Sequence, residues 1–203
     1  MQKILITYYS QSGSTKEIAR ELYDTIKGAK VDLLEVSSVC HLNYDRIIIG
    51  TPNKYGKPAT PVMHFLKKYA EELQNKEMDI FFTCMDCYRD GGYDEYPFHI
   101  YTDTSLPHWI IPAEEMSSWQ KSHAVSTYVS NLQDIVVDLN LASISFFKGR
   151  LNFKRLPFIE RMVMRLISLM NKDVAEGDYL NIKDVKNWCE LKKSSIATEA
   201  SIV

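Results

Sequence analysis

The sequence has few cysteines, little net charge and no long apolar run. Its 203 residues include four cysteines, too few for the disulfide framework of a small secreted scaffold. The 24 Lys and Arg residues nearly balance the 26 Asp and Glu residues, which gives no overall case for nucleic-acid binding. No stretch reaches the ~18 consecutive apolar residues that a membrane span needs. The N-terminus also lacks the apolar core of an export signal, so we expect a cytoplasmic protein.

The overall amino-acid composition is that of a packed globular domain. Hydrophobic residues make up 45% of the chain and charged residues 25%, which excludes wholesale disorder and fibrous repeats. Because domains hold roughly 100–200 residues, we predict one domain over residues 1–192. The small, polar segment 193–203 is predicted to be a flexible tail.

Short apolar strands alternate with helical patterns along most of the chain. We predict strands at 3–8, 31–36, 44–50, 79–83 and 142–147, and helices at about 15–26, from Pro58 and Pro61 to Leu73, and at about 119–139, 157–170 and 182–191. This alternation implies right-handed crossovers and a parallel sheet with helices on both faces. The expected fold is an α/β three-layer sandwich with a five-stranded parallel sheet.

Residues 88–118 interrupt the alternation. They are rich in Tyr, Gly, Asp and Pro and show no sustained period, so we interpret them as an irregular insertion before the fifth strand. Long irregular loops often carry function. The aromatic residues here favour either a lid or docking surface, with a homodimer contact left open, or a small satellite core.

The most informative motif follows the first strand and reads Ser10-Gln11-Ser12-Gly13-Ser14-Thr15. Four hydroxyl side chains and one glycine stand where the N–H groups of a beginning helix are unpaired, an arrangement that favours phosphate. No P-loop lysine pattern is present, which argues against a nucleoside triphosphate. A Ser-rich helix cap with a purely structural role would give the same pattern.

Two segments resemble the flavodoxin family. Residues 4–19 resemble its phosphate-binding start, hydroxyl-x-hydroxyl-Gly-x-Thr, and residues 49–58 (IGTPNKYGKP) resemble the loop after the third strand that flanks the flavin. The resemblance implies a flavodoxin-like sheet of order 2-1-3-4-5, with noncovalent FMN at the carboxyl ends of the strands, as is known for that family.

The resemblance also implies a set of cofactor-binding residues. Tyr55 and Tyr88 are candidates for stacking on the flavin face, and Asp86 for accepting a hydrogen bond from the flavin N3–H. The full expected set is Ser10, Ser12, Gly13, Ser14, Thr15, Thr51, Pro52, Asn53, Lys54, Tyr55, Gly56, Thr83, Cys84, Met85, Asp86 and Tyr88.

We expect no metal site. The histidines are scattered, and Cys84-x-x-Cys87 has no second cysteine pair for zinc. This motif leaves three interpretations open: two ordinary reduced thiols, a flavin-linked dithiol or a pair of metal ligands.

The C-terminal part resembles one branch of the flavodoxin-like proteins. Residues 148–153 and 159–167 are similar to the menaquinone-dependent, oxygen-independent protoporphyrinogen dehydrogenases, a branch that binds FMN and associates with membrane. The resemblance covers roughly 1–87 and 141–190, whereas 88–140 matches poorly. Residues 148–172 carry seven cations against Glu160 alone, beside many apolar residues. Such a segment can lie on an anionic membrane surface, dock a partner, or pack on the sheet with its arginines solvated.

The resemblance thus implies an FMN-dependent redox protein, either an electron-transfer flavoprotein or a quinone-type oxidoreductase. Its expected partners are a redox protein or a quinone, with peripheral contact at the inner face of the membrane through residues 148–172. A narrower alternative is a protoporphyrinogen IX dehydrogenase that uses menaquinone. A third alternative is a flavodoxin-fold binding module without a cofactor.

Overall fold

A computed structural model describes residues 1–54, 56–91, 96–134, 139–170 and 175–200. Its main sheet has seven strands. Six of them pair in parallel in the order β2-β1-β3-β5-β7-β6, and β4 pairs antiparallel with the end of β3. The strands are β1 (Lys3–Tyr8), β2 (Lys30–Glu35), β3 (Arg46–Lys54), β4 (Lys57–Pro58), β5 (Glu77–Cys84), β6 (His99–Thr102) and β7 (Leu141–Lys148).

The predicted strand order is confirmed, but the predicted number of strands is too small. The five expected strands are β1, β2, β3, β5 and β7, and their order is 2-1-3-4-5. The sheet has seven strands because β4 and β6 join it. β6 comes from within the supposedly irregular insertion and pairs with β7 from His99↔Ser143 to Thr102↔Phe146. Its side chains are exposed or half-buried, so no buried apolar run marks this edge strand in the sequence.

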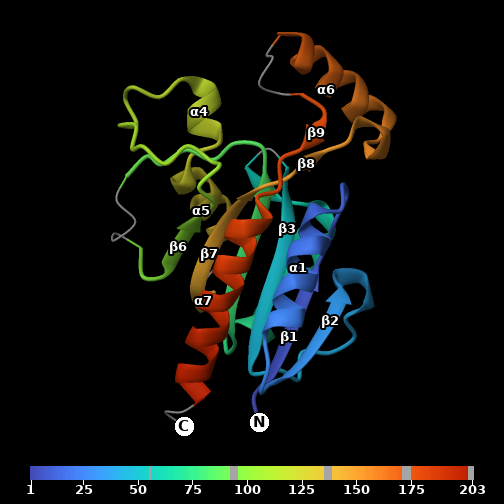
Figure 1. Ribbon diagram of the computed structural model, residues 1–203, viewed down its shortest axis with the longest axis vertical. Coiled ribbons are helices and arrows are strands. Elements are labelled where there is room, and N and C mark those ends of the chain that lie inside the picture. Colours follow the sequence, from blue (N-terminus) through green and yellow to red (C-terminus); the bar gives the residue numbers. More distant parts are fainter. Residues whose placement is uncertain (55, 92–95, 135–138, 171–174, 201–203) are drawn as a thin grey trace.

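Helices cover both faces of the sheet, which gives three layers. α1 (Ser14–Thr25) and α7 (Ile182–Ala200) lie side by side on one face (Figure 1), where Leu22 and Trp188 pack with Phe81. The other face carries α2 (Thr60–Lys68), α3 (Ala70–Leu73) and α5 (Val125–Gln133). Each face of the sheet thus packs into its own hydrophobic core.

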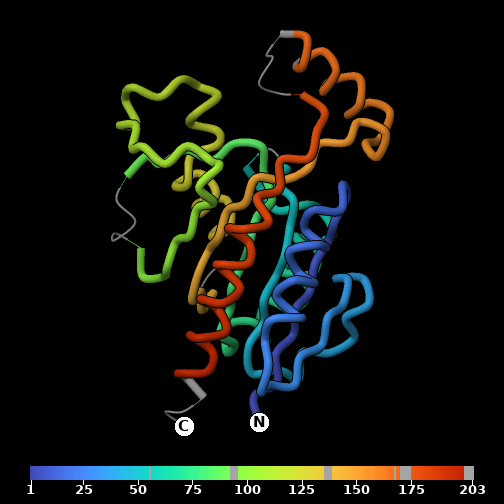
Figure 2. The backbone as a smooth tube through the Cα atoms, viewed as in Figure 1, coloured from blue at the N-terminus to red at the C-terminus, as the bar shows by residue number. Residues whose placement is uncertain are grey.

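Two helices lie beyond the carboxyl end of the sheet. α4 (Ser118–Ser122) and α6 (Phe158–Met170) project above the strands on opposite sides, as the backbone trace shows (Figure 2). The segment that carries α6 leaves and returns through two short antiparallel strands, β8 (Arg150–Leu151) and β9 (Gly177–Asp178). No helix among the described residues is long and apolar enough to cross a membrane.

Two helix predictions need correction. The helix expected at 119–139 is broken between α4 and α5, because Ala124 is extended and pairs with Tyr88; residues 135–138 lie outside the described residues. The helix predicted at 182–191 is too short, because α7 runs from Ile182 to Ala200 and includes residues 193–200 of the predicted tail. This last part of α7 is held by Ile196, which is buried against the sheet; residues 201–203 lie outside the described residues.

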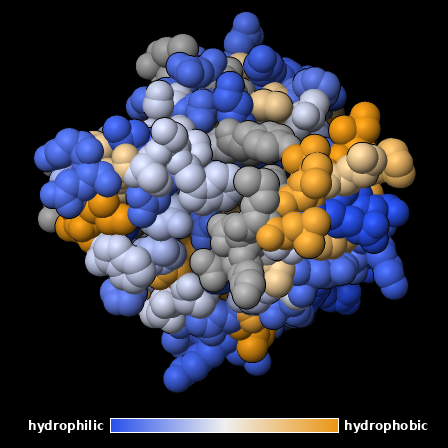
Figure 3. All heavy atoms as spheres, turned by 90° about the horizontal axis from the view of Figure 1, so that it is seen from above, coloured by the Kyte–Doolittle hydropathy of each residue, from blue (hydrophilic) through white to orange (hydrophobic). Residues whose placement is uncertain are grey.

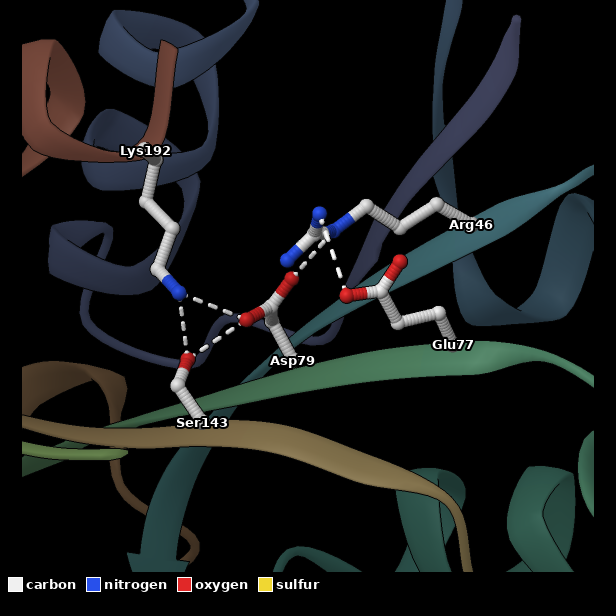
Figure 4. Close-up of polar contacts among 5 residues, drawn as sticks. All are labelled: Arg46, Glu77, Asp79, Ser143 and Lys192. Atoms are coloured by element: carbon white, nitrogen blue, oxygen red, sulfur yellow. Dashed lines mark hydrogen bonds and ion pairs between the residues drawn. The ribbon is translucent and has the colours of Figure 1, made fainter. Parts of the chain in front are cut away.

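A buried charge network lies at the amino end of the sheet (Figure 4). The carboxylate of Asp79 in β5 accepts from Arg46 Nε at 2.7 Å and from Lys192 Nζ of α7 at 2.6 Å. The Ser143 hydroxyl bonds the same carboxylate, and Arg46 also pairs with Glu77 at 3.3 Å. Burial acts to raise the pKa of Asp79, but Lys192 and Arg46 outweigh it and hold that pKa below its ordinary value. The network ties α7 to three strands.

Candidate functional site

A cavity of about 200 Å³ opens at the carboxyl end of the sheet. Its wall combines the β1–α1 loop, the ends of β3 and β5, the turn after β7, and the helices α4 and α6. The lining residues are Gln11, Ser12, Ser14, Thr15, Pro52, Asn53, Lys54, Thr83, Cys84, Met85, Trp119, His123, Gly149, Arg150, Leu151, Leu156, Glu160 and Met164. Most of the residues expected to bind the cofactor therefore meet in one place.

The hydroxyl loop forms one side of the cavity. Gly13 is the N-cap of α1 and has a left-handed backbone (φ 101°), which glycine adopts at little cost. No side chain caps the helix, so its first N–H groups have no side-chain acceptor. The Ser10 hydroxyl accepts a hydrogen bond from the Gly13 N–H at 3.1 Å, which holds the turn. Ser10 and Gly13 thus shape the loop, while Ser12, Ser14 and Thr15 line the cavity.

Thr15 and Thr83 link two of the cavity's loops. Their hydroxyl oxygens are 2.8 Å apart and buried. Only one of these hydroxyls donates to the other, so the accepting one keeps its own proton for a ligand. Gly149 allows the chain to pass close to Thr83 and Ser14, because a Cβ there would lie 3.3 Å from both Thr83 Cβ and Ser14 Oγ. The arrangement of hydroxyls and helix N–H groups fits a phosphate group.

The loop after β3 is shaped by its own polar contacts. Pro52, Asn53 and Lys54 line the cavity, whereas Thr51 and Gly56 do not. The buried Thr51 hydroxyl accepts from the Ala59 N–H at 2.9 Å. Asn53 Oδ1 accepts from the Gly56 N–H at 2.8 Å. The predicted contact of Tyr55 lies outside the described residues.

In the loop after β5 as well, only some of the expected residues line the cavity. Thr83, Cys84 and Met85 line the cavity, as their position at the strand end predicts. Asp86 and Tyr88 do not: the Asp86 carbonyl accepts from the Tyr128 hydroxyl at 3.2 Å, and the Tyr88 N–H donates to the His123 carbonyl at 2.9 Å. Asp86 thus connects the loop to α5, and Tyr88 connects it to the C-cap of α4.

The two cysteines of the C-x-x-C motif are buried thiols. Burial is the main cause that raises the pKa of Cys84 and of Cys87 above the ordinary thiol value. Both thiols are therefore protonated at neutral pH, which disfavours thiolate chemistry. Within the described part of the chain, no group of three or more potential ligand side chains could hold a metal ion.

Sequence reasoning missed the residues that reach the cavity from distant segments. Trp119 and His123 come from α4 and its C-cap, and their rings stack with centroids 4.2 Å apart. Leu156, Glu160 and Met164 come from the α6 segment, and Glu160 pairs with Lys54 at 2.6 Å. Gln11 lies within the recognised motif, so it could have been included. The others carry no local signal, because only the folded chain brings them to the cavity.

Arg150 and Arg155 were missed for the same reason. An Nη1 atom of each lies against Gly13, 3.2 and 3.4 Å from the position of a Cβ there. Arg150 Nη2 pairs with Glu17 at 3.0 Å and with Asp178 at 2.5 Å. The hydrogen bond to Asp178 is the main cause that raises the pKa of Arg150, so this guanidinium is permanently charged.

Comparisons with known proteins find one family and several distant relatives. The family model described as a flavodoxin domain matches residues 5–178. The protoporphyrinogen IX dehydrogenase [quinone] of Escherichia coli (strain K12) is 33% identical over 78 residues, which are 36% of this chain and 43% of that protein. A Bacillus subtilis (strain 168) protein named probable flavodoxin 1 is 31% identical over 102 residues, 48% of this chain and 61% of that protein. The chain thus spans less than two thirds of the length of either relative.

Among solved structures, a flavoprotein in complex with FMN from Lactobacillus acidophilus NCFM is similar to the chain. It is 21% identical, the match covers 72% of this chain and 93% of that chain, and the TM-score is 0.42. The family match extends over most of the chain and includes both the hydroxyl loop and the segment that carries α6.

Proposed function

The chain belongs to the flavodoxin domain family and is an FMN-binding redox protein, and from this premise we propose that it is an oxidoreductase that reduces a quinone. FMN supplies the one- and two-electron chemistry when bound. The observation that carries the proposal is the position of α6, which lines the cavity with Glu160 and Met164 and exposes apolar side chains on its outer surface.

We assign the cofactor's binding residues from the cavity wall. Ser12, Ser14, Thr15 and the N–H groups of α1 hold the phosphate, because hydroxyls and uncapped N–H groups satisfy its oxygens. Pro52–Lys54 and Thr83–Met85 flank the flavin ring. The α6 segment contributes Leu156 and Met164, which exclude water from the ring. In a drier site the polar contacts to the flavin are stronger.

The outer surface of α6 supports contact with a membrane. Six of its apolar side chains are exposed: Phe158, Ile159, Met162, Val163, Leu166 and Leu169. Viewed from above, they form the apolar patch on the right of the molecule (Figure 3). Soluble proteins rarely leave a contiguous patch of this kind uncovered. Arg161 and Arg165 lie on the same helix, and its acidic residue Glu160 is already paired with Lys54.

This combination favours a surface that carries anionic lipid. The apolar side chains enter the boundary between headgroups and acyl chains, and the arginines pair with the headgroups. Since α6 also lines the cavity, a quinone dissolved in the membrane has a short path to the flavin. The same arrangement has no evident use in a carrier that meets only soluble partners.

The proposal is tested with purified protein in two measurements. FMN is added to the protein, the bound flavin is reduced with one equivalent of dithionite in the absence of oxygen, and transfer of its two electrons and two protons to a water-soluble quinone is followed. Separately, sedimentation with vesicles of phosphatidylcholine and phosphatidylglycerol is compared for wild type and the α6 variant Ile159→Glu/Leu166→Glu. The matched control is Leu191→Glu, which alters an exposed apolar residue on α7.

We expect quinone reduction that requires FMN, and vesicle binding that is lost in the α6 variant and kept in the control. Fast electron transfer to a redox protein, together with no quinone reduction, would instead favour an electron carrier. The name of the Bacillus subtilis relative suggests such a role. A colourless protein that binds no added FMN would favour the cofactor-free binding module. Vesicle binding unaffected by the α6 substitutions would reject this helix as the membrane contact.

The narrower alternative is a protoporphyrinogen IX dehydrogenase that uses menaquinone. It is supported by the identity with the Escherichia coli enzyme, which covers less than half of that protein. This alternative predicts FMN-dependent oxidation of protoporphyrinogen IX with menaquinone as acceptor. Rapid turnover of unrelated donors without any oxidation of this porphyrinogen would reject it and leave the broader proposal intact.

A further inference from the structure

We infer that Arg150 and Arg155 together bind the cofactor's phosphate and set a preference for FMN over riboflavin, the flavin that lacks the phosphate. The inference rests on the proposed placement of the phosphate at the loop from Ser10 to Thr15. By sequence, that loop offers hydroxyl and amide groups but no cation. The two guanidinium groups would supply the missing positive charge from a segment far along the chain.

Both guanidinium groups lie against the phosphate loop. A Cβ placed on Gly13 would be 3.2 Å from Arg150 Nη1 and 3.4 Å from Arg155 Nη1. Gly13 is the N-cap of α1, so the two groups stand beside the first N–H groups of that helix. Arg150 also lines the cavity together with Ser12 and Ser14. An anion bound by the helix N–H groups therefore adjoins both cations.

The orientation of Arg150 is fixed before a ligand arrives. Its Nη2 donates to Glu17 of α1 at 3.0 Å and to Asp178 of β9 at 2.5 Å. These bonds occupy one nitrogen and leave Nη1 on the side of Gly13. A donor that is already positioned loses little conformational freedom when the ligand binds, so each hydrogen bond to phosphate contributes more to affinity.

Arg155 differs from Arg150 in having no acidic partner among the described residues. Across the described ranges, no ion pair joins its guanidinium to an acidic side chain, whereas Arg150 is balanced by Glu17 and Asp178. A phosphate dianion placed at the loop would be attracted mainly by Arg155. Charge-assisted hydrogen bonds between guanidinium and phosphate are shorter and stronger than those of neutral donors.

The decisive variant is Arg155→Met, because this exposed residue can be changed without opening the core. Dissociation constants for FMN and riboflavin are measured by the quenching of flavin fluorescence, at low and at high salt. The matched control is Arg20→Met, which removes an exposed arginine from α1 farther along the helix. Arg150→Met and Arg150→Lys form a second pair, in which Lys keeps the charge but loses the forked geometry.

We expect Arg155→Met to weaken FMN binding about tenfold or more, as loss of a charge-assisted hydrogen bond predicts, with riboflavin binding unchanged. The salt dependence of FMN binding should fall as well. Arg150→Lys should retain more FMN affinity than Arg150→Met, and Arg20→Met should match wild type.

Equal losses for the two flavins would overturn the inference, since they would indicate a structural role. Unchanged FMN affinity in all the arginine variants would also overturn it. If wild type binds FMN and the arginine variants bind it equally well, the inference fails but the proposed function stands. A wild-type protein that binds neither flavin removes the proposed function and the inference together.

Discussion

At the amino end of the sheet, Asp79 is 1% exposed and bonded to Arg46, Lys192 and Ser143. At the carboxyl end, Arg155 is exposed without a described acidic partner, and the first N–H groups of α1 have no side-chain cap. The amino end satisfies its charges internally and fixes the packing of α7. The carboxyl end leaves donors for a ligand to satisfy. Polar groups of similar kinds are thus satisfied within the fold at one end and, in the proposed function, by a ligand at the other.

The largest effect should come from breaking the network at the amino end. Asp79→Asn leaves the Lys192 and Arg46 cations buried without their shared anion, which costs about 3–5 kcal/mol of unfolding free energy. Urea denaturation measures the loss, and Glu190→Gln, which removes an exposed pair with Lys193, serves as the control. FMN affinity of the folded variant should not change. A loss no larger than the control's would mean that the network does not stabilise the fold.

The same network should make stability fall in acid. Because the pKa of Asp79 is lowered in the folded protein, its stabilising effect is fully present above the unfolded-state pKa of about 3.9. The effect is lost as pH falls through the lower folded-state pKa. The difference in unfolding free energy between wild type and Asp79→Asn should therefore be constant near neutral pH and shrink below about pH 4. A difference that persists undiminished in acid would contradict the assignment.

A change at the carboxyl end should affect binding more than stability. Ser12→Ala/Thr15→Ala removes two hydroxyls from the proposed phosphate subsite and should weaken FMN binding at least about tenfold. Loss of the bond between Thr15 and Thr83 should cost only about 1 kcal/mol of stability. Fluorescence titration and thermal unfolding measure the two effects. Thr25→Ala, at the far end of α1, should leave FMN affinity intact; equal weakening there would remove the loop assignment.

The smallest effect should come from the ion pair between Lys54 and Glu160. Both side chains are about one third exposed, so Glu160→Gln should cost less than about 1 kcal/mol. The expected consequence is faster hydrogen exchange in the α6 segment, with the exchange of the central strands unchanged. High salt should reduce the difference between variant and wild type, since it screens such pairs. Faster exchange throughout the sheet would show that α6 is not an independent unit.

The sequence predicted best where local patterns decide the structure. The buried runs that became β1, β3, β5 and β7 stand out because strands covered on both faces are continuously apolar. The hydroxyl loop was recognisable because its residues are contiguous. The half-buried β6 has no such run, and the break at Ala124 depends on a pairing with Tyr88, which is distant in sequence.

The remaining site residues depend on tertiary structure. Trp119, Arg150 and Glu160 reach the cavity from segments that have no fixed spacing to the hydroxyl loop. The helical course of residues 193–200 follows from the burial of Ile196, although polar residues dominate the local composition. Periodicity reports which face of an element is buried, and it cannot report which distant segments meet.

The pairing of β8 with β9 brings Leu151 opposite Gly177, so the chain leaves and returns at neighbouring positions. Everything between these residues is an excursion that interrupts no strand of the main sheet. In evolution such an excursion can be lengthened, replaced or exchanged with little disturbance of the structure beneath it. The part of the molecule that we propose to cover the flavin can therefore diverge faster than the part that maintains the fold.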